Sequence, residues 1–359
     1  MKMKRLLITF LTFILVVSAI AQPPANYYNS ANGLTGNQLK VALHNIIKGH
    51  TSISYSNLWN AFWSTDNKGN GIVWDMYSDI PGGTPGYVYH LGEDQCGSGG
   101  CNNSEGTCYN REHSWPQSWF SEQSTPRTDL HHIFPTDCQV NHDRSNYPYG
   151  EVSSGTTFQN GSKLGRSKTP GYTGTVFEPI DEYKGDFARA YFYMSVRYYG
   201  EDAAWKTTDM TAKSEIKPWA MAMLLRWNRL DPVSQKEIDR NNAIYNDYQY
   251  NRNPFIDHPE YADMIWDPNW SVDENNSESV ASIHPNPVQR GGTLYIYTGN
   301  QPMDQVMVYD LSGRLLLQMH VENDEMPSLI LPNDLQSGFY LLRLCDGNSV
   351  VTNKKLLIN

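Results

Sequence analysis

The stretch CYNREHSWPQSWF, residues 108–120, places an acid and an imidazole side by side just before a proline. Neighbouring side chains on a regular strand point to opposite faces, so Glu112 and His113 can share a site only where the strand stops. Pro116 predicts such a stop, because proline restricts the preceding residue and cannot continue a hydrogen-bonded ladder. We therefore expect a strand to end at residues 111–113, with both side chains entering one cleft.

A second polar segment, RTDLHHIFPTDCQVNHDRSNYPYGE at residues 127–151, supplies possible partners for this pair. Hydrolysis of a phosphodiester needs a base that activates water and a cation that neutralises the developing charge. A neutral histidine suits the role of base near pH 7. Mg²⁺ prefers oxygen ligands, a few from the protein and the rest from water. These needs predict His113 as the general base, with Glu112 and Asn141 as metal ligands.

Taken singly, each of these residues has a more ordinary explanation. An isolated glutamate is usually a solvated carboxylate, and Asn141 alone would be a turn or cap residue. Asp129 can brace a loop, and His131 and His132 cannot both face inward if they lie on a strand. The aromatic run YFYMSVRYY, residues 191–199, is expected in the core of the protein, with a base-stacking surface as the alternative.

Taken together, the motifs favour the catalytic interpretation, because in this order they resemble the bacterial endonuclease I family. The resemblance is carried by NREHSWPQSWF, TDLHHIFPTDCQVNHDRSNYPYGE, FEPIDEYKGDFARAYFYMSVRYY and QYNRNPFIDHPEYADMIW, and it covers most of residues 30–267. It implies a ββα-metal (His-Me finger) core and endonucleolytic cleavage of DNA, often also RNA, with little sequence preference and 5′-phosphate products. Carried over to this chain, it implies that Glu112 and Asn141 bind the metal and that His113 is the general base. The expected cation is Mg²⁺, with Ca²⁺ or Mn²⁺ as alternatives.

One position departs from this family pattern. Some relatives have a glutamate two residues before the aspartate of the DLH motif, where this chain has Arg127. The metal shell is then expected to contain more water, or else Arg127 is expected to bind phosphate.

Basic residues near the motifs are candidates for substrate binding, although the chain has 38 acidic against 28 basic residues and a net charge of −10. That balance argues against a general nucleic-acid coat protein, but an enzyme needs only a local basic groove. The acid-free segment NGSKLGRSKTP, residues 160–170, is predicted to be a phosphate-contacting loop, with an ordinary solvated loop as the alternative. The predicted substrate-binding residues are Arg111, Arg127, Arg144, Lys163, Arg166 and Lys168.

The beginning of the chain has the pattern of a secretory signal peptide, residues 1–21. A basic start is followed by a short apolar run and a small-residue cleavage motif, with an uncleaved membrane anchor as the alternative. Export makes disulfides permissible, and four of the five cysteines lie in one short region, Cys96, Cys101, Cys108 and Cys138. Two disulfides are expected, with all three pairings open. The spacings do not favour the alternative of a zinc site.

The remaining sequence predicts an α+β architecture in two domains. Helices are expected within 36–50, 183–199 and 217–230, and a fourth after Ser234, where Glu237 completes a capping box. A short strand is expected within 71–80. Residues 22–270 form the predicted nuclease domain, and the polar, acidic residues 271–281 form a linker. Beyond it, six or seven short alternating runs predict a small all-β sandwich at 282–359, including a hairpin in VMVYDLSGRLLLQ.

This last region has a resemblance of its own, to the C-terminal sorting domains of substrates of type IX secretion. It is carried by HPNPV, VMVYDLSGRLL, LQSGFYLLRL and the terminal KKLLIN. The resemblance implies recognition by that secretion machinery, passage across the outer membrane, and removal of the tail or attachment to the cell surface. An accessory sandwich that binds polymer or carbohydrate is the alternative.

Together these observations predict a secreted, metal-dependent, largely nonspecific endonuclease. We expect it to act on DNA, with RNA as an alternative or additional substrate, to work as a monomer, and to have no stable membrane insertion. Two other classes fit the same residues, namely a nucleic-acid-binding protein whose catalytic site has decayed and a metal-dependent phosphatase.

Overall fold

The computed structural model describes residues 23–97, 100–101, 103–267, 282–297, 303–310, 314–321, 327–346 and 349–359. The chain divides after residue 270 into two compact units. The predicted signal peptide, 1–21, and the predicted linker, 271–281, both lie outside the described residues. Within the described ranges, no helix is both long enough and apolar enough to cross a membrane.

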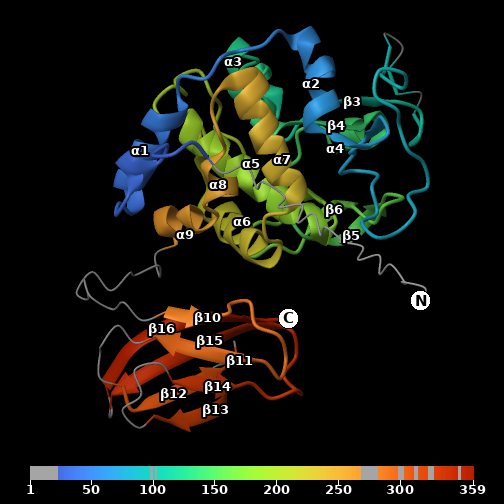
Figure 1. Cartoon of the computed structure of the whole chain (residues 1–359). Coiled ribbons are helices and arrows are strands. Elements are labelled where there is room, and N and C mark those ends of the chain that lie inside the picture. Colours follow the sequence, from blue (N-terminus) through green and yellow to red (C-terminus); the bar gives the residue numbers. More distant parts are fainter. Residues whose placement is uncertain are drawn as a thin grey trace, which may run out of the picture. The chain divides into compact units, whose positions relative to one another are not determined.

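The first unit is built around one helix, α5 (Lys184–Arg197), whose side chains are buried almost all round. It is packed against α1 (Gly36–Ile47), α6 (Pro218–Leu230) and α8 (Pro254–Asp257) (Figure 1). Tyr191, Phe192 and Tyr193 are fully buried, so the aromatic run is core, as expected.

Other helices surround this centre, and the sequence signals place their ends correctly. Helix α7 (Gln235–Ala243) begins at Ser234, whose side chain accepts from the Glu237 amide while Glu237 reaches back in the predicted capping box. It runs into a π-helical turn, η6 (Ile244–Gln249). The remaining α-helices are α2 (Leu58–Thr65), α3 (Ser124–Arg127), α4 (Cys138–Arg144) and α9 (Glu260–Trp266), and short 3-10 turns lie at Asn29–Ala31, Tyr55–Asn57, Gln117–Phe120, Leu130–His132 and Asp181–Tyr183.

A two-stranded hairpin followed by a helix forms the part of the unit that matters for chemistry. Strand β3 (Tyr109–His113) pairs antiparallel with β4 (Ile133–Asp137), so that His113 lies opposite Ile133. The chain passes from β4 directly into α4, where the Asp137 side chain caps the helix by accepting from the Val140 amide. This order of two strands and a helix is the ββα arrangement that was expected.

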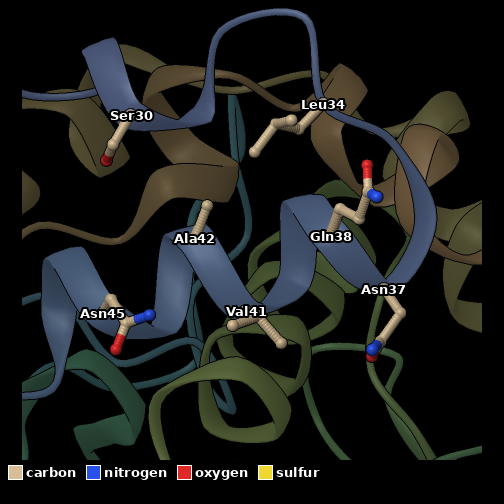
Figure 2. Close-up of a pocket in the computed structure, with 7 residues that line it drawn as sticks. All are labelled: Ser30, Leu34, Asn37, Gln38, Val41, Ala42 and Asn45. Atoms are coloured by element: carbon tan, nitrogen blue, oxygen red, sulfur yellow. The ribbon is translucent and has the colours of Figure 1, made fainter.

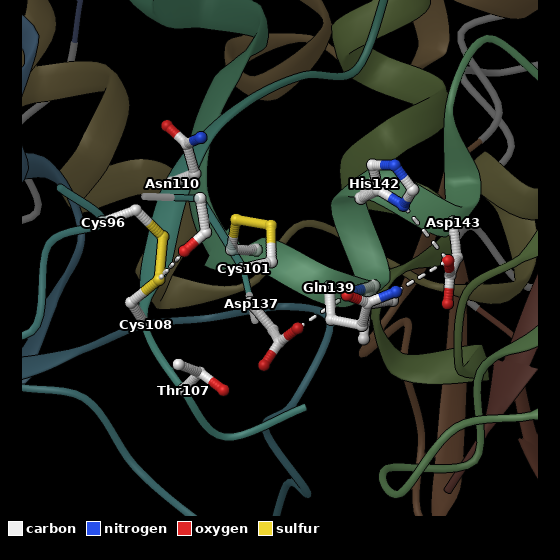
Figure 3. Close-up of a disulfide and its surroundings, with 12 residues drawn as sticks. Cys96, Cys101, Thr107, Cys108, Asn110, Asp137, Gln139, His142 and Asp143 are labelled. Atoms are coloured by element: carbon white, nitrogen blue, oxygen red, sulfur yellow. Dashed lines mark hydrogen bonds and ion pairs between the residues drawn. A yellow bond between two sulfur atoms is a disulfide. The ribbon is translucent and has the colours of Figure 1, made fainter. Parts of the chain in front are cut away.

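Two disulfides brace this hairpin and helix (Figure 3). Cys96 pairs with Cys108, immediately before β3, and Cys101 pairs with Cys138, the first residue of α4. This resolves the open pairing and leaves no thiolates in the cluster for the alternative zinc site.

The other sheets of the first unit are small. Strands β5 (Val152–Thr157), β6 (Lys163–Ser167) and β7 (Thr175–Glu178) form one antiparallel sheet. Two-stranded ribbons join β1 (Asn67–Gly69) to β2 (Ile72–Val73), and β8 (Thr211–Ala212) to β9 (Glu215–Ile216). The strand expected within 71–80 is thus only two residues long.

The second unit is an all-β sandwich, which confirms the α+β class with a β C-terminal region. One sheet has the order β10 (Ser282–His284), β11 (Thr293–Tyr297), β14 (Ser328–Ile330). The other has the order β13 (Leu315–His320), β12 (Gln305–Tyr309), β15 (Gly338–Asp346), β16 (Ser349–Ile358). Leu294 and Leu329 from the first sheet share a core with Val308 and Leu342 from the second. The predicted hairpin is the β12–β13 pair, and its turn at 311–313 lies outside the described residues.

Candidate active site

A polar cavity of about 120 Å³ lies where β3 ends and α4 runs past it. Glu112 and His113 come from the end of β3, and Asn141 comes from α4. All three line the cavity, although Asn141 is about thirty positions away in the sequence. The complete lining is Arg111, Glu112, His113, Pro116, Gln117, Asn141, Arg144, Ser145 and Asn146.

The strand ends at His113, as the position of Pro116 predicted. The polar atoms of the neighbouring pair nevertheless meet different partners. Glu112 binds Tyr77 and Arg144, whereas the ring of His113 packs near His132. The two residues border one cavity because it lies at the end of the strand, where both sides of the backbone become accessible.

Glu112 is held by one of its two carboxylate oxygens. Its Oε1 accepts from the Tyr77 hydroxyl at 2.9 Å and from Arg144 Nη1 at 2.9 Å. Burial raises the pKa of Glu112, and the Arg144 guanidinium counteracts that rise. Oε2 takes part in neither of these two contacts and is not among the enclosed, unpaired atoms of the described residues, so it is open to a ligand.

Arg144 is buried, with an exposed fraction of only 1%. Besides Glu112, its guanidinium donates to the carbonyls of His113, at 3.1 Å, and Ser114, at 2.6 Å. Its Cζ also lies 4.7 Å from the centre of the Tyr149 ring. Both terminal nitrogens of this guanidinium are engaged by the protein, and only the enclosed Nε lacks a partner among the described residues. This placement favours a positioning role for Arg144 over the predicted phosphate contact.

His113 is oriented through its Nε2 atom, which lies 3.0 Å from the backbone carbonyl oxygen of Arg127. A carbonyl can only accept, so Nε2 carries the proton and Nδ1 of the neutral ring keeps its lone pair. Nδ1 makes no hydrogen bond to any described residue and is not enclosed. Burial, together with the neighbouring His132, lowers the pKa of His113 to about 3, so the ring is neutral at physiological pH.

The loop that holds His113 is fixed by Asp129, which is fully buried. Its carboxylate caps the turn Leu130–His132 by accepting from the His131 amide, and it also accepts from the Tyr193 and Tyr198 hydroxyls, each at 2.9 Å. Asp129 therefore braces a loop, which is the structural role expected for it from the sequence.

The two histidines after Asp129 correct an assumption about this segment. Both are buried, because they lie on a 3-10 turn rather than on a strand, where alternation would separate them. His131 Nε2 contacts the Asn251 carbonyl at 3.2 Å, and His132 Nε2 contacts the Pro126 carbonyl at 2.7 Å. Both contacts are structural, and neither histidine lines the cavity.

The donor atoms around the cavity fit a hard divalent cation. Asn141 is half-buried, and its side-chain amide makes no hydrogen bond to the described residues. Glu112 and Asn141 together offer one carboxylate and one amide oxygen among the residues that line this small polar space. Mg²⁺ uses such donors together with several waters.

Two further predicted residues, Arg111 and Arg127, lie around one tyrosine beside the cavity. Their Cζ atoms are 3.8 and 4.1 Å from the centre of the Tyr55 ring. Arg111 donates to the Tyr55 carbonyl at 2.9 Å, and Arg127 Nε donates to Gln117 Oε1 at 2.9 Å. Both arginines are half-buried, and within the described residues neither forms an ion pair with a carboxylate.

The three remaining basic residues lie elsewhere, and the segment that carries them is not a loop. Lys163 and Arg166 belong to strand β6, with Lys168 just after it. Residues three apart on a strand point to opposite faces, so Lys163 and Arg166 do not share one surface. None of the three lines the cavity. The loop prediction for residues 160–170 is therefore wrong, and a phosphate contact by these residues stays a prediction.

A larger hollow, of about 580 Å³, lies on α1 and faces the segment before it (Figure 2). Its lining consists of amide, hydroxyl and apolar side chains, Ser30, Leu34, Asn37, Gln38, Val41, Ala42 and Asn45. No ionisable group is among them, so its size does not make it a candidate for catalysis.

Sequence reasoning missed the residues that hold the site in place. Tyr77 binds both Glu112 and the Tyr149 hydroxyl, at 2.8 Å, yet it lies 35 positions before Glu112. Tyr55 and Gln117 were also missed. Tyr149 could have been found, because it lies within the polar segment that also contains Asn141. No motif in the sequence around Tyr77 points to a role in the site.

Comparison with known proteins shows which families this chain matches. The endonuclease I family matches residues 35–260, and the secretion system C-terminal sorting domain matches residues 282–359. An extracellular ribonuclease of Bacillus amyloliquefaciens is 42% identical over 259 residues, 69% of this chain and 82% of that protein. The extracellular ribonuclease of Bacillus subtilis (strain 168) is 40% identical over 264 residues, 70% of this chain and 83% of its own length. An endonuclease-1 of Buchnera aphidicola subsp. Baizongia pistaciae is 32% identical over 129 residues, 36% of this chain and 46% of its own.

Proposed function

Because this chain belongs to the endonuclease I family and is a secreted nuclease, we propose that it is a metal-dependent, largely sequence-nonspecific endonuclease. The substrate is DNA and also RNA, and the products carry 5′-phosphate ends. One observation carries the proposal. Glu112, His113 and Asn141 line a single polar cavity, and the atoms Oε2, Nδ1 and the amide oxygen are not among the enclosed, unpaired atoms of the described residues.

His113 is the general base in this proposal. Its Nδ1 takes a proton from a water molecule held in the cavity, while the Arg127 carbonyl keeps the ring in place through Nε2–H. The activated water attacks phosphorus in line with the leaving 3′ oxygen. The low pKa makes the resting ring a weak base, and the negative charge of a bound phosphate favours the protonated form and so raises its basicity.

Glu112 and Asn141 would hold the divalent cation, with Mg²⁺ as our choice and Ca²⁺ or Mn²⁺ as alternatives. A cation there supplies charge stabilisation for the crowded phosphorus and the departing oxygen. Arg144 and Tyr77 keep Glu112 pointing into the cavity, which is preorganisation of the kind that electrostatic catalysis needs.

The experiment that tests this proposal is plasmid nicking with Mg²⁺ and again with excess EDTA. Nicking that requires the cation, together with phosphatase-sensitive 5′ end groups on the products, supports the proposal. Absence of nicking under every cation tried overturns it in favour of a decayed binding protein. Cleavage of a small phosphomonoester without nicking would make the chain a phosphatase.

We propose that the C-terminal sandwich serves export rather than catalysis. The sorting-domain match covers residues 282–359, almost the whole second unit. The secretion machinery that reads such tails is then the partner of this unit. Mass spectrometry of the exported protein tests this, because a sorting domain is expected to be missing from the mature form or to be modified at its end.

A further inference from the structure

A second pocket, of about 260 Å³, has Arg127 among its lining residues. One side of it is the segment from Ser52 to Tyr55. The other side carries Ser124, Arg127 and Thr128. Arg127 connects the two spaces, because its carbonyl orients His113 while its side chain donates to Gln117, a residue of the polar cavity, and also lines the second pocket.

The charges at this boundary are unusual for the molecule. Other arginines buried in the same unit are paired with carboxylates, as in Arg189–Glu237 at 2.5 Å and Arg240–Asp66 at 3.0 Å. Arg111 and Arg127 both lie within 4.1 Å of the Tyr55 ring centre, and among the described residues no carboxylate is paired with either. The chain as a whole has an excess of acids, so a shortage of carboxylates does not explain this.

Two neighbouring positive charges, partly withdrawn from water, repel each other unless an anion lies between or beside them. The missing anion is therefore expected to come from a ligand. A polynucleotide that passes through the polar cavity brings further phosphates to this boundary.

We infer that the pocket between Ser52–Tyr55 and Ser124–Thr128 is a subsite for the nucleotide next to the scissile phosphate. Arg111 and Arg127 bind the phosphate on that side, and the pocket takes the sugar–base unit. The serine and threonine side chains of its walls give this subsite hydroxyl groups for a polar sugar, and Ile53 gives it an apolar surface for a base. This inference rests on the proposed endonuclease activity and specifies how its substrate is held.

Filling the pocket tests the inference without altering the cavity. We would make Ser124→Trp and, from the opposite wall, Ser52→Trp, both at exposed positions. Ser30→Trp is the matched control, because Ser30 is an exposed serine at the distant hollow on α1. Thermal melting of all three proteins identifies any variant that fails to fold, and the other pocket variant then carries the test.

The readout is steady-state cleavage of a fluorogenic single-stranded oligodeoxynucleotide with saturating Mg²⁺. We expect KM to rise at least tenfold for each pocket variant, with kcat changed much less, and Ser30→Trp to match the wild type. A folded pocket variant that keeps the wild-type KM overturns the inference while leaving the endonuclease proposal intact. Absence of cleavage by the wild-type protein removes the proposed function itself, so the two failures are distinguishable.

Discussion

Replacing Arg144 with methionine would test whether this buried guanidinium exists to hold Glu112. The substitution keeps an unbranched side chain of similar reach but removes the charge 2.9 Å from Glu112 Oε1. Glu112 then stays buried with only the Tyr77 hydroxyl bound to it. Breaking a buried ion pair by removing one partner typically costs about 3–5 kcal/mol, because the remaining charge is uncompensated. We expect the free energy of unfolding to fall by about that amount.

Urea unfolding followed by tryptophan fluorescence measures this loss in the intact protein. All ten tryptophans lie before residue 271, so the signal reports the nuclease unit and not the C-terminal sandwich. EDTA keeps metal from contributing. Arg226→Met is the matched control, since Arg226 pairs with Glu151 at 2.6 Å but is 44% exposed. Exposed pairs contribute about 0–1 kcal/mol, so the control should be nearly as stable as the wild type.

A double-mutant cycle with Glu112→Gln separates the ion pair from packing. When the carboxylate charge is absent, Arg144→Met should lower the free energy of unfolding by about 0.5–3 kcal/mol less than it does in the wild-type background. Turnover of Arg144→Met with saturating Mg²⁺ should also fall, by roughly 10–100-fold, as for other residues that orient a metal ligand. An equal cost of Arg144→Met in both backgrounds would show that Arg144 stabilises the fold without acting on Glu112, and the reasoning would be wrong.

Two other predictions follow from the site and its bracing. His113→Ala should lower plasmid-nicking turnover by about 100-fold or more, while fluorescence anisotropy with a labelled oligonucleotide shows near-normal binding, since the base is lost but the basic surface remains. Removing the Cys101–Cys138 disulfide, whose partners are 37 positions apart, should lower the free energy of unfolding by about 4 kcal/mol. Removing Cys96–Cys108, with its separation of 12, should cost about 3 kcal/mol, and chemical denaturation of the double-serine variants measures both losses.

The sequence predicted those parts of the fold and site that depend on local signals. The capping box places the start of α7 correctly, and Pro116 marks the end of β3. Helix α4, which carries Asn141, was not predicted. It has only seven residues and no apolar periodicity, and its stability comes from the Asp137 cap and from a disulfide at its first residue.

The role of Arg144 was beyond sequence reasoning for a different physical reason. Near a cluster of polar motifs, an arginine is most simply read as a phosphate ligand. Only the folded chain brings Tyr77, Arg144 and Glu112 together, across 35 and 32 positions of sequence. Burial then favours a positioning role, because the terminal nitrogens of this enclosed guanidinium are bound to a carboxylate and two backbone carbonyls.

The same logic explains why a glutamate and a histidine can be neighbours in one site. Each has one polar atom occupied by the protein, Oε1 of Glu112 by Arg144 and Tyr77, and Nε2 of His113 by the Arg127 carbonyl. Each therefore has its other atom left open to the cavity. Neighbouring side chains on a strand point to opposite faces, so Glu112 and His113 are held by different partners. Each of the two side chains can therefore be fixed independently of the other. The end of the strand at His113 is the condition that lets both free atoms reach one space.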